Sequence, residues 1–127
     1  MRARFISGLG YGSYDSILVA FQNRDACFTD ALEQREVTCW FEEDLYDQLQ
    51  LMQVLHHRNN SSTGKPFFLV QHKKFFGLNP AGVRRLHAQR RPVSKKQMTF
   101  ATEAWRAFVS DTPENLLRIV HKKIAQP

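Results

Sequence analysis

An acidic cluster occupies residues 42–47, where Glu42, Glu43, Asp44 and Asp47 follow the apolar pair Trp40-Phe41. Carboxylate oxygens are the ligands that Mg²⁺ prefers, and a carboxyl group can act as a general acid or base. Glu42, Asp44 and Asp47 are therefore the candidate catalytic and metal-binding residues, with Mg²⁺ as the candidate cofactor. Acidic residues in the first turn of a helix also complement the helix dipole, so a purely structural interpretation stays open.

Basic pairs recur in the second half of the chain, and the first of them, Lys73-Lys74, is followed by Phe75-Phe76. Aromatic rings beside lysines are typical of surfaces that stack on bases and contact phosphates. The candidate anion-binding residues are Lys73, Lys74, Arg84, Arg85, Arg90 and Arg91. The alternative is a set of solvated helix faces with both phenylalanines turned inward.

Three other patterns give little support for a site. The run Gly8-x-Gly10-x-Gly12 lacks the third glycine of a dinucleotide-binding fingerprint. His56 and His57 point about 100° apart on a helix, and their spacing from Cys39 is not that of a zinc site. Neither Cys27 nor Cys39 has a histidine at a telling distance, so a thiol nucleophile is unsupported.

The periodicity of apolar residues predicts a strand–helix–strand unit around the acidic cluster. Residues 36–41 and 67–71 are rich in β-formers and read as strands, and the helix between them begins at Asp44 and runs over 44–57. Such a unit makes the two strands parallel, joined by a right-handed crossover. The acidic cluster then lies at the carboxyl end of the first strand, where open α/β sheets bind ligands.

Helices are predicted on both sides of this unit. One is capped by Ser13 after the glycine-rich turn, and three more begin at Asn79-Pro80, Ser94 and Thr112-Pro113. The fold class is thus α/β, a small parallel sheet on a βαβ unit followed by three C-terminal helices. Since two strands make a poor sheet, we expect a third strand or another cover. We expect Trp40, Leu49, Trp105 and Leu116 to be mostly buried.

The length of the chain predicts a single domain over residues 1–127, with the polar stretch 59–66 as a candidate internal boundary. Residues 1–64 carry a net charge of −4 and residues 65–127 carry +10, which favours an anionic partner for the second half. No apolar run is long enough to cross a membrane and no signal peptide is visible, so we expect a cytoplasmic protein with reduced thiols.

The segment 40–53, Trp-Phe-Glu-Glu-Asp-Leu-Tyr-Asp-Gln-Leu-Gln-Leu-Met-Gln, resembles the signature of a bacterial family catalogued as domain of unknown function 1835. Residues 2–6, 12–14 and 24–25 are similar to the same family, as are 90–93, 104–108 and 111–113. The family carries a histidine where this chain has Glu43, and its members usually begin with a further strand and turn. The resemblance implies no activity. It implies that this chain resembles a family member that is truncated at its N-terminus.

Three functions follow as expectations. The first is a non-enzymatic or degenerate binding domain that holds a nucleotide or nucleic acid through the basic half. The second is a metal-dependent enzyme acting on a phosphorylated substrate with the residues of the acidic cluster. The third is an interaction module, a homodimer that pairs through a sheet edge left by the family's missing strand, unless Met1–Ile6 folds back as a strand.

Overall fold

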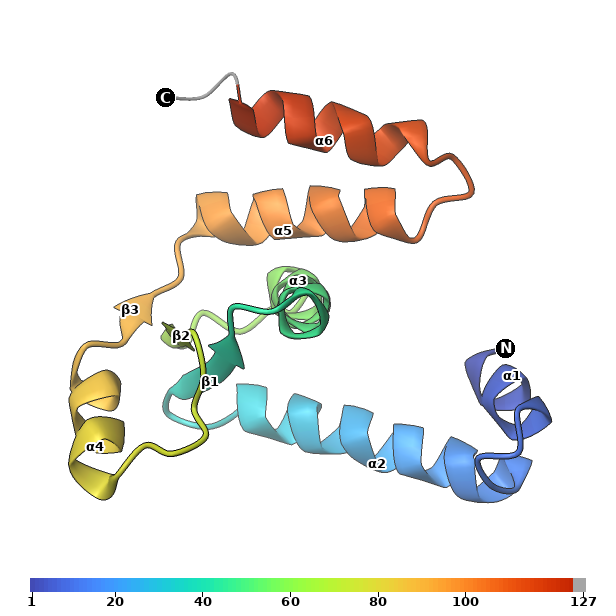
Figure 1. The fold of residues 1–127 in the computed structure, drawn as a ribbon, viewed down its shortest axis with the longest axis horizontal. Coiled ribbons are helices and arrows are strands. Elements are labelled where there is room, and N and C mark those ends of the chain that lie inside the picture. Colours follow the sequence, from blue (N-terminus) through green and yellow to red (C-terminus); the bar gives the residue numbers. More distant parts are fainter. Residues whose placement is uncertain (125–127) are drawn as a thin grey trace. The chain divides into compact units, whose positions relative to one another are not determined.

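The computed structural model describes residues 1–124, and the side chains of residues 1–120. Within it the chain forms two compact units, Met1–Arg35 and a second that begins at Glu36 (Figure 1). Each unit is considered by itself. The stretch 59–66 lies inside the second unit. No helix of the described part of the chain is long and apolar enough to cross a membrane.

The first unit is a pair of helices, α1 (Arg2–Gly8) and α2 (Tyr14–Leu32), which contact each other. The turn between them uses Gly10 and Gly12 at φ values of 83° and 133°, a region that favours glycine. Ser13 caps α2 as predicted, because its Oγ accepts a hydrogen bond from the Ser16 N–H at 3.2 Å. The alternative to a homodimer, that Met1–Ile6 folds back as a strand on the sheet, is wrong, since Arg2–Gly8 is helical.

Cation–π contacts help to explain why α1 folds onto α2 rather than forming a strand. The guanidinium carbon of Arg2 lies 6.0 Å from the ring centroid of Phe21, and that of Arg4 lies 5.9 Å from the ring of Tyr14. Contacts of this kind contribute about 0.5–1 kcal/mol each at exposed sites. Ala3, which stands between the two arginines in the sequence, is buried.

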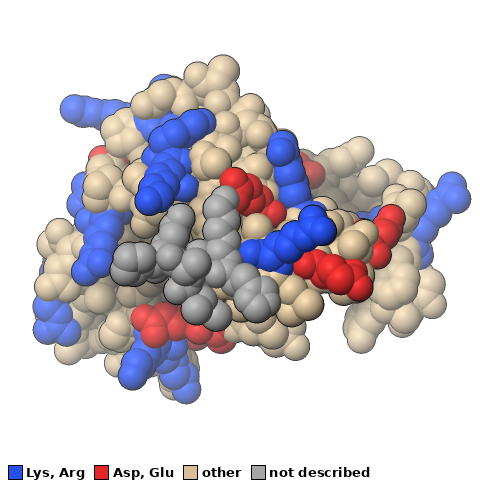
Figure 2. Space-filling model, turned by 90° about the horizontal axis from the view of Figure 1, so that it is seen from above, with Lys and Arg blue, Asp and Glu red and all other residues tan. Residues whose placement is uncertain are grey.

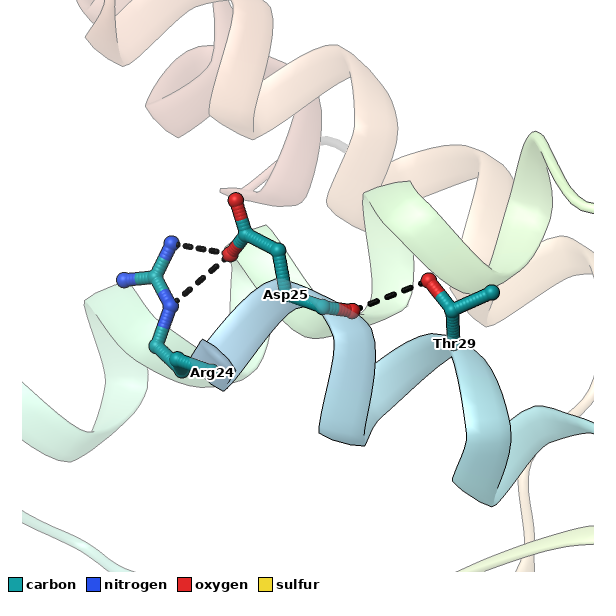
Figure 3. A network of polar contacts seen from close by, with 3 residues as sticks. All are labelled: Arg24, Asp25 and Thr29. Atoms are coloured by element: carbon teal, nitrogen blue, oxygen red, sulfur yellow. Dashed lines mark hydrogen bonds and ion pairs between the residues drawn. The ribbon is translucent and has the colours of Figure 1, made fainter. Parts of the chain in front are cut away.

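Further along α2, a local polar network surrounds Asp25 (Figure 3). Arg24 donates from Nε and Nη2 to Asp25 Oδ1 at 2.9 and 2.6 Å, and Thr29 Oγ1 donates to the Asp25 carbonyl at 2.9 Å. The ion pair is more than half exposed on both sides, so it contributes little to stability.

The second unit has a three-stranded sheet and four helices within the described residues. In chain order they are β1 (Val37–Glu42), α3 (Leu45–Asn59), β2 (Phe67–His72), α4 (Pro80–Ala88), β3 (Arg91–Pro92), α5 (Lys95–Phe108) and α6 (Glu114–Ile124). The predicted α/β class, the parallel strand pair and the C-terminal helices are confirmed. Val37 pairs with Phe67 and Glu42 with His72 across the parallel strands.

A third strand covers the other edge of β2, but it is short and antiparallel, so the sheet is mixed and not purely parallel. Arg91 pairs with Leu69 and Pro92 with Phe68. Pro92 has no N–H to donate, which suits a strand at the edge of a sheet. At the opposite edge, β1 has β2 as its only strand neighbour in the described part of the sheet.

The core of the second unit lies between α3, β2 and α5. Its buried apolar side chains, which are at most 8% exposed, are Leu51, Leu55, Phe67, Val70, Met98, Ala101, Ala104 and Ala107. The three alanines of α5 let this helix approach α3 closely, and the two helices share the most extensive contact of any pair of elements.

None of the four large residues expected to be mostly buried is in the fully buried core, and the expectation is wrong for Leu116, which counts among the exposed apolar residues. Trp40, Leu49 and Trp105 are only half-buried, and Leu116 is 37% exposed. Trp105 lies 5.7 Å from Phe108 between ring centroids on α5, whereas Trp40, on β1, packs against Phe75 and His87. Leu116 belongs to the last helix, whose apolar side chains α5 covers only in part.

Candidate functional site

The acidic cluster closes the junction between β1 and α3. Asp44 is the N-cap of α3, and its Oδ1 accepts the Asp47 N–H at 2.9 Å. Asp47 Oδ2 in turn accepts the Glu42 N–H at 2.5 Å. Glu42 Oε1 accepts the N–H of Phe75 at 2.7 Å, from the loop that follows β2. Each candidate carboxylate therefore satisfies a backbone N–H group.

Amide groups extend this network across the carboxyl ends of both parallel strands. Gln48 Nε2 donates to the Glu42 carbonyl at 2.9 Å, and the Glu43 N–H donates to the His72 carbonyl at 3.2 Å. Within residues 1–120, no group of three or more His, Cys, Asp or Glu residues could hold a metal ion. The carboxylates of Glu42, Asp44 and Asp47 thus bond separate backbone N–H groups, and in the described part of the chain they do not converge on a centre that could hold Mg²⁺.

An aromatic cluster, which the sequence did not indicate, lies beside this network. The Trp40 ring is 5.6 Å from the Phe75 ring in an edge-on contact and 6.3 Å from the His87 ring in a stacked one. The rings of His72 and Phe75 are 6.2 Å apart. Trp40 therefore joins the loop after β2 to α4, and both elements lie on one side of the sheet.

The loop of residues 73–77 holds its two phenylalanines differently. Phe75 packs inward on Trp40, whereas Phe76 is 88% exposed. The Nζ of Lys74 lies 5.7 Å from the centroid of the Phe76 ring. Gly77, at φ 87°, turns the chain directly after Phe76. The loop thus presents one exposed aromatic ring flanked by the charges of Lys73 and Lys74.

The candidate anion-binding residues do not form one continuous patch. Lys73, Lys74, Arg84, Arg85 and Arg91 are exposed. On the face drawn in Figure 2, basic side chains are interspersed with acidic and uncharged surface. Arg91 lies apart from the lysines, on β3, where it borders a cavity of about 380 Å³ together with Glu43, Gln89 and Gln97.

Arg90 differs from the other candidate residues because its guanidinium group contacts other parts of the protein. Its guanidinium carbon lies 4.7 Å from the Phe68 ring centroid, and its Nη groups donate to the His87 carbonyl at 3.2 Å and to Glu36 at 3.4 Å. Arg90 Nε is buried without a hydrogen-bond partner. We therefore assign Arg90 to holding α4 against the sheet and not to ligand contact.

Among the side chains of residues 1–120, the remaining titratable groups do not assemble into a catalytic set. Burial raises the pKa of the Cys39 thiol to about 11, which disfavours the thiolate. Burial, assisted by the charges of Arg106 and His57, lowers the pKa of His56. His56 contacts Asn60 through its ring nitrogens at 3.3–3.4 Å. Neither group lies in the network at the ends of β1 and β2.

No protein-family model, curated protein or solved structure matches this chain. The resemblance to the family of unknown function thus rests on the sequence segments alone and stays a prediction. What the described residues offer after the carboxyl end of β2 is the exposed Phe76 ring beside Lys74, and the exposed Arg84 and Arg85 follow on α4. We refer to Lys73, Lys74, Phe76, Arg84 and Arg85 together as the loop–α4 surface.

Proposed function

We propose that this protein binds single-stranded nucleic acid at the loop–α4 surface. One observation carries the proposal: Phe76 is 88% exposed, and the Lys74 ammonium lies 5.7 Å from its ring centroid. A large apolar ring left in water and held beside a cation is the arrangement on which a base stacks and a phosphate binds. The charge of the second half of the chain, +10 over residues 65–127, favours the same partner.

Contacts from β1 support the loop and α4 beneath this surface. The N–H of Phe75 is held by Glu42, and its ring by Trp40. Because His87 stacks on the same Trp40, α4 is fixed beside the loop. Arg84 lies one turn before His87 on α4, and among the described side chains Arg84, Arg85 and Lys73 form no hydrogen bond or ion pair. Their charges are available to phosphates.

The two other functions receive less support. An Mg²⁺-dependent reaction would need the carboxylates of Glu42, Asp44 and Asp47 to converge on one ion, and no group of three such ligands is present among the described residues. A homodimer through the sheet would use the outer edge of β1, and it stays a prediction, because nothing among the described residues indicates a second chain. Binding of a free nucleotide uses the same chemistry as the favoured function, and competition separates the two.

The test is fluorescence anisotropy with a labelled single-stranded oligonucleotide over a range of salt concentrations. Phe76→Ala should weaken binding about tenfold, because stacking contributes about 1–3 kcal/mol per base. Lys73→Ala combined with Lys74→Ala should reduce the salt dependence by a slope of about 0.7 for each phosphate that the variant no longer neutralises. An unlabelled mononucleotide should compete poorly if several bases are held.

Matched controls make the result specific. Tyr11→Ala removes another exposed ring, 78% exposed, from the first unit. Lys96→Ala with Arg118→Ala removes the same charge from α5 and α6. Both controls should leave the affinity within about twofold of the wild type. Equal losses from the charge control, or no saturable binding at low salt, would contradict the proposal.

A further inference from the structure

A buried cation without a counter-charge lies at the other end of β2. Arg58, in the last turn of α3, is only 8% exposed. Its Nη1 donates to Ser61 Oγ at 3.2 Å and its Nη2 to the Lys65 carbonyl at 2.8 Å. Within the described residues Arg58 forms no ion pair with a carboxylate. The carbonyl groups at the end of α3 offset part of the charge, but burial of a guanidinium is costly without an anion.

A cavity of about 380 Å³ adjoins this guanidinium. Its polar wall includes Arg58, Ser61, Thr63 and Lys95, and its apolar wall includes Pro92 and Val93. Pro66 and Phe67, at the amino end of β2, also border the cavity, so it lies at the opposite end of that strand from the loop–α4 surface. We refer to it as the Arg58 pocket.

A chain of hydrogen bonds holds a second cation at the pocket. Lys95 Nζ donates to Asn59 Oδ1 at 2.7 Å, and Asn59 Nδ2 donates to Thr102 Oγ1 at 3.1 Å. Thr102 is only 6% exposed, so this series of hydrogen bonds ends at a buried residue in the contact between α3 and α5. Lys95 is also the first residue of α5, whose N-terminal end adds positive potential.

Hydrogen-bond donors remain for a ligand. Arg58 has five N–H donors, and its described hydrogen bonds use two of them. Thr63 Oγ1 accepts the Lys65 N–H at 3.3 Å, which leaves its hydroxyl proton to donate. Ser61 differs, because its hydroxyl already donates to the Arg58 carbonyl at 2.7 Å.

We propose that the Arg58 pocket binds a phosphoryl group, as inorganic phosphate or as the phosphate of a small monoester. The two cations match the charge of a phosphate dianion, and the planar guanidinium fork suits its oxygens. The apolar wall at Pro92 and Val93 accommodates a small organic substituent. This site does not depend on the loop–α4 surface, and none of its residues belongs to the candidate sets predicted from the sequence.

The experiment uses the full chain and isothermal titration with inorganic phosphate and with phenyl phosphate, against sodium chloride at matched ionic strength. Both phosphates should give saturable binding, and phenyl phosphate should bind more tightly. Lys95→Ala should raise the Kd about tenfold, the loss expected for one charge-assisted hydrogen bond. Asn59→Asp should have a similar effect, because its new carboxylate neutralises Lys95 at the pocket.

Lys96→Ala is the matched control, since it removes an equal charge one residue further along α5 but does not border the cavity. It should leave the Kd within about twofold of the wild type. Equal effects of Lys95→Ala and Lys96→Ala would overturn the proposal, as would no difference between phosphate and chloride. Benzoate that binds as tightly as phenyl phosphate would overturn the choice of a phosphoryl group.

Two further variants keep the outcome clear. Arg58→Gln should abolish phosphate binding. This variant also loses the hydrogen bond from Arg58 to the Lys65 carbonyl, so it could fail to fold. In that case the phosphate affinities of Lys95→Ala and Asn59→Asp test the proposal. Phe76→Ala should leave phosphate binding unchanged. Phosphate binding that is lost in Phe76→Ala would place the ion at the loop–α4 surface and overturn the Arg58 pocket.

Discussion

Carboxylates that follow a strand can serve a ligand or the backbone, and in this molecule three of them serve the backbone. Glu42, Asp44 and Asp47 each accept an N–H group at 2.5–2.9 Å. A buried or half-buried N–H without an acceptor costs about 1–3 kcal/mol, so these bonds stabilise the β1–α3 junction. The bond to Glu42 also holds the backbone of Phe75 in the loop that presents Phe76.

The two cysteines should react very differently with an alkylating reagent. Cys27 is exposed, whereas Cys39 is half-buried on β1 and burial raises its pKa to about 11. At pH 8 only about one Cys39 side chain in a thousand would then be a thiolate, the reactive form. Iodoacetamide at this pH should modify Cys27 and spare Cys39, as measured by peptide mass spectrometry.

Unfolding the protein in urea provides the control, because Cys39 then loses its buried environment and both thiols should react at similar rates. Rapid modification of Cys39 in the folded protein would show that β1 opens readily. It would also weaken the argument that the strands form a stable frame for the loop–α4 surface.

At the residue scale, the sequence indicated which side chains matter at the carboxyl ends of the strands but not what each one does. Asp44 was recognisable as a helix cap, and the order Lys73-Lys74-Phe75-Phe76 marked the basic and aromatic loop. Which phenylalanine turns inward depends on Trp40, which is remote in the sequence.

The sequence did not indicate the buried position of Arg58 either, because this position also depends on residues that are remote in the sequence. The pocket that Arg58 borders is also lined by Pro92, Val93 and Met98, which are distant in the sequence, and no local pattern encodes that arrangement. A usable signal was present nevertheless: a cation in the last turn of a helix, followed by the run Ser61-Ser62-Thr63-Gly64.

At the scale of single elements, side-chain caps determine where most helices begin. Ser13, Asp44, Asn79 and Ser94 each accept a hydrogen bond from a backbone N–H in the first turn. These starts were predictable, because a cap acts through residues that are close in the sequence. Ser94 forms a full capping box with Gln97, in which each side chain accepts the backbone N–H of the other.

Removal of this capping box should lower stability by a measurable amount. Ser94→Ala should reduce the free energy of unfolding by about 1 kcal/mol, the usual cost of an N-cap serine. Urea unfolding followed by circular dichroism measures it. Ser62→Ala is the control, because Ser62 is exposed and forms no hydrogen bond in the described structure; it should change stability by less than about 0.5 kcal/mol. Equal effects would show that α5 does not depend on its cap.

The sequence did not predict α1 and β3, because the stability of these two elements depends on their contacts with other elements. The helix α1 has seven residues and no side-chain cap, and isolated helices of that length are unstable in water. The strand β3 has two residues, one of them a proline. Its place follows from pairing with Leu69 and Phe68, which no short-range pattern specifies.

At the scale of the whole molecule, the buried core is divided unevenly between the two units. The first unit contributes Ala3 and Leu32 to the buried apolar residues, whereas the second contributes the eight others. Both proposed binding sites also lie entirely within the second unit. The contribution of residues 1–35 to stability and function is therefore a separate question from that of the rest of the chain.

We expect residues 36–127 to fold without residues 1–35. Their core joins α3, β2 and α5, and their described hydrogen bonds at the two proposed sites stay within the unit. The isolated segment should show a helical circular dichroism spectrum and a cooperative urea transition. Residues 1–35 alone should show little stable structure, because chains below about 40 residues rarely bury enough apolar surface to fold unaided.

The alkylation of Cys39 gives this experiment a local readout. If the isolated segment keeps its native sheet, Cys39 should remain as slow to react as in the full chain, and phenyl phosphate should bind with an unchanged Kd. A segment that unfolds without cooperativity, or in which Cys39 reacts quickly, would contradict the expectation. That result would mean that residues 36–127 do not fold independently of residues 1–35.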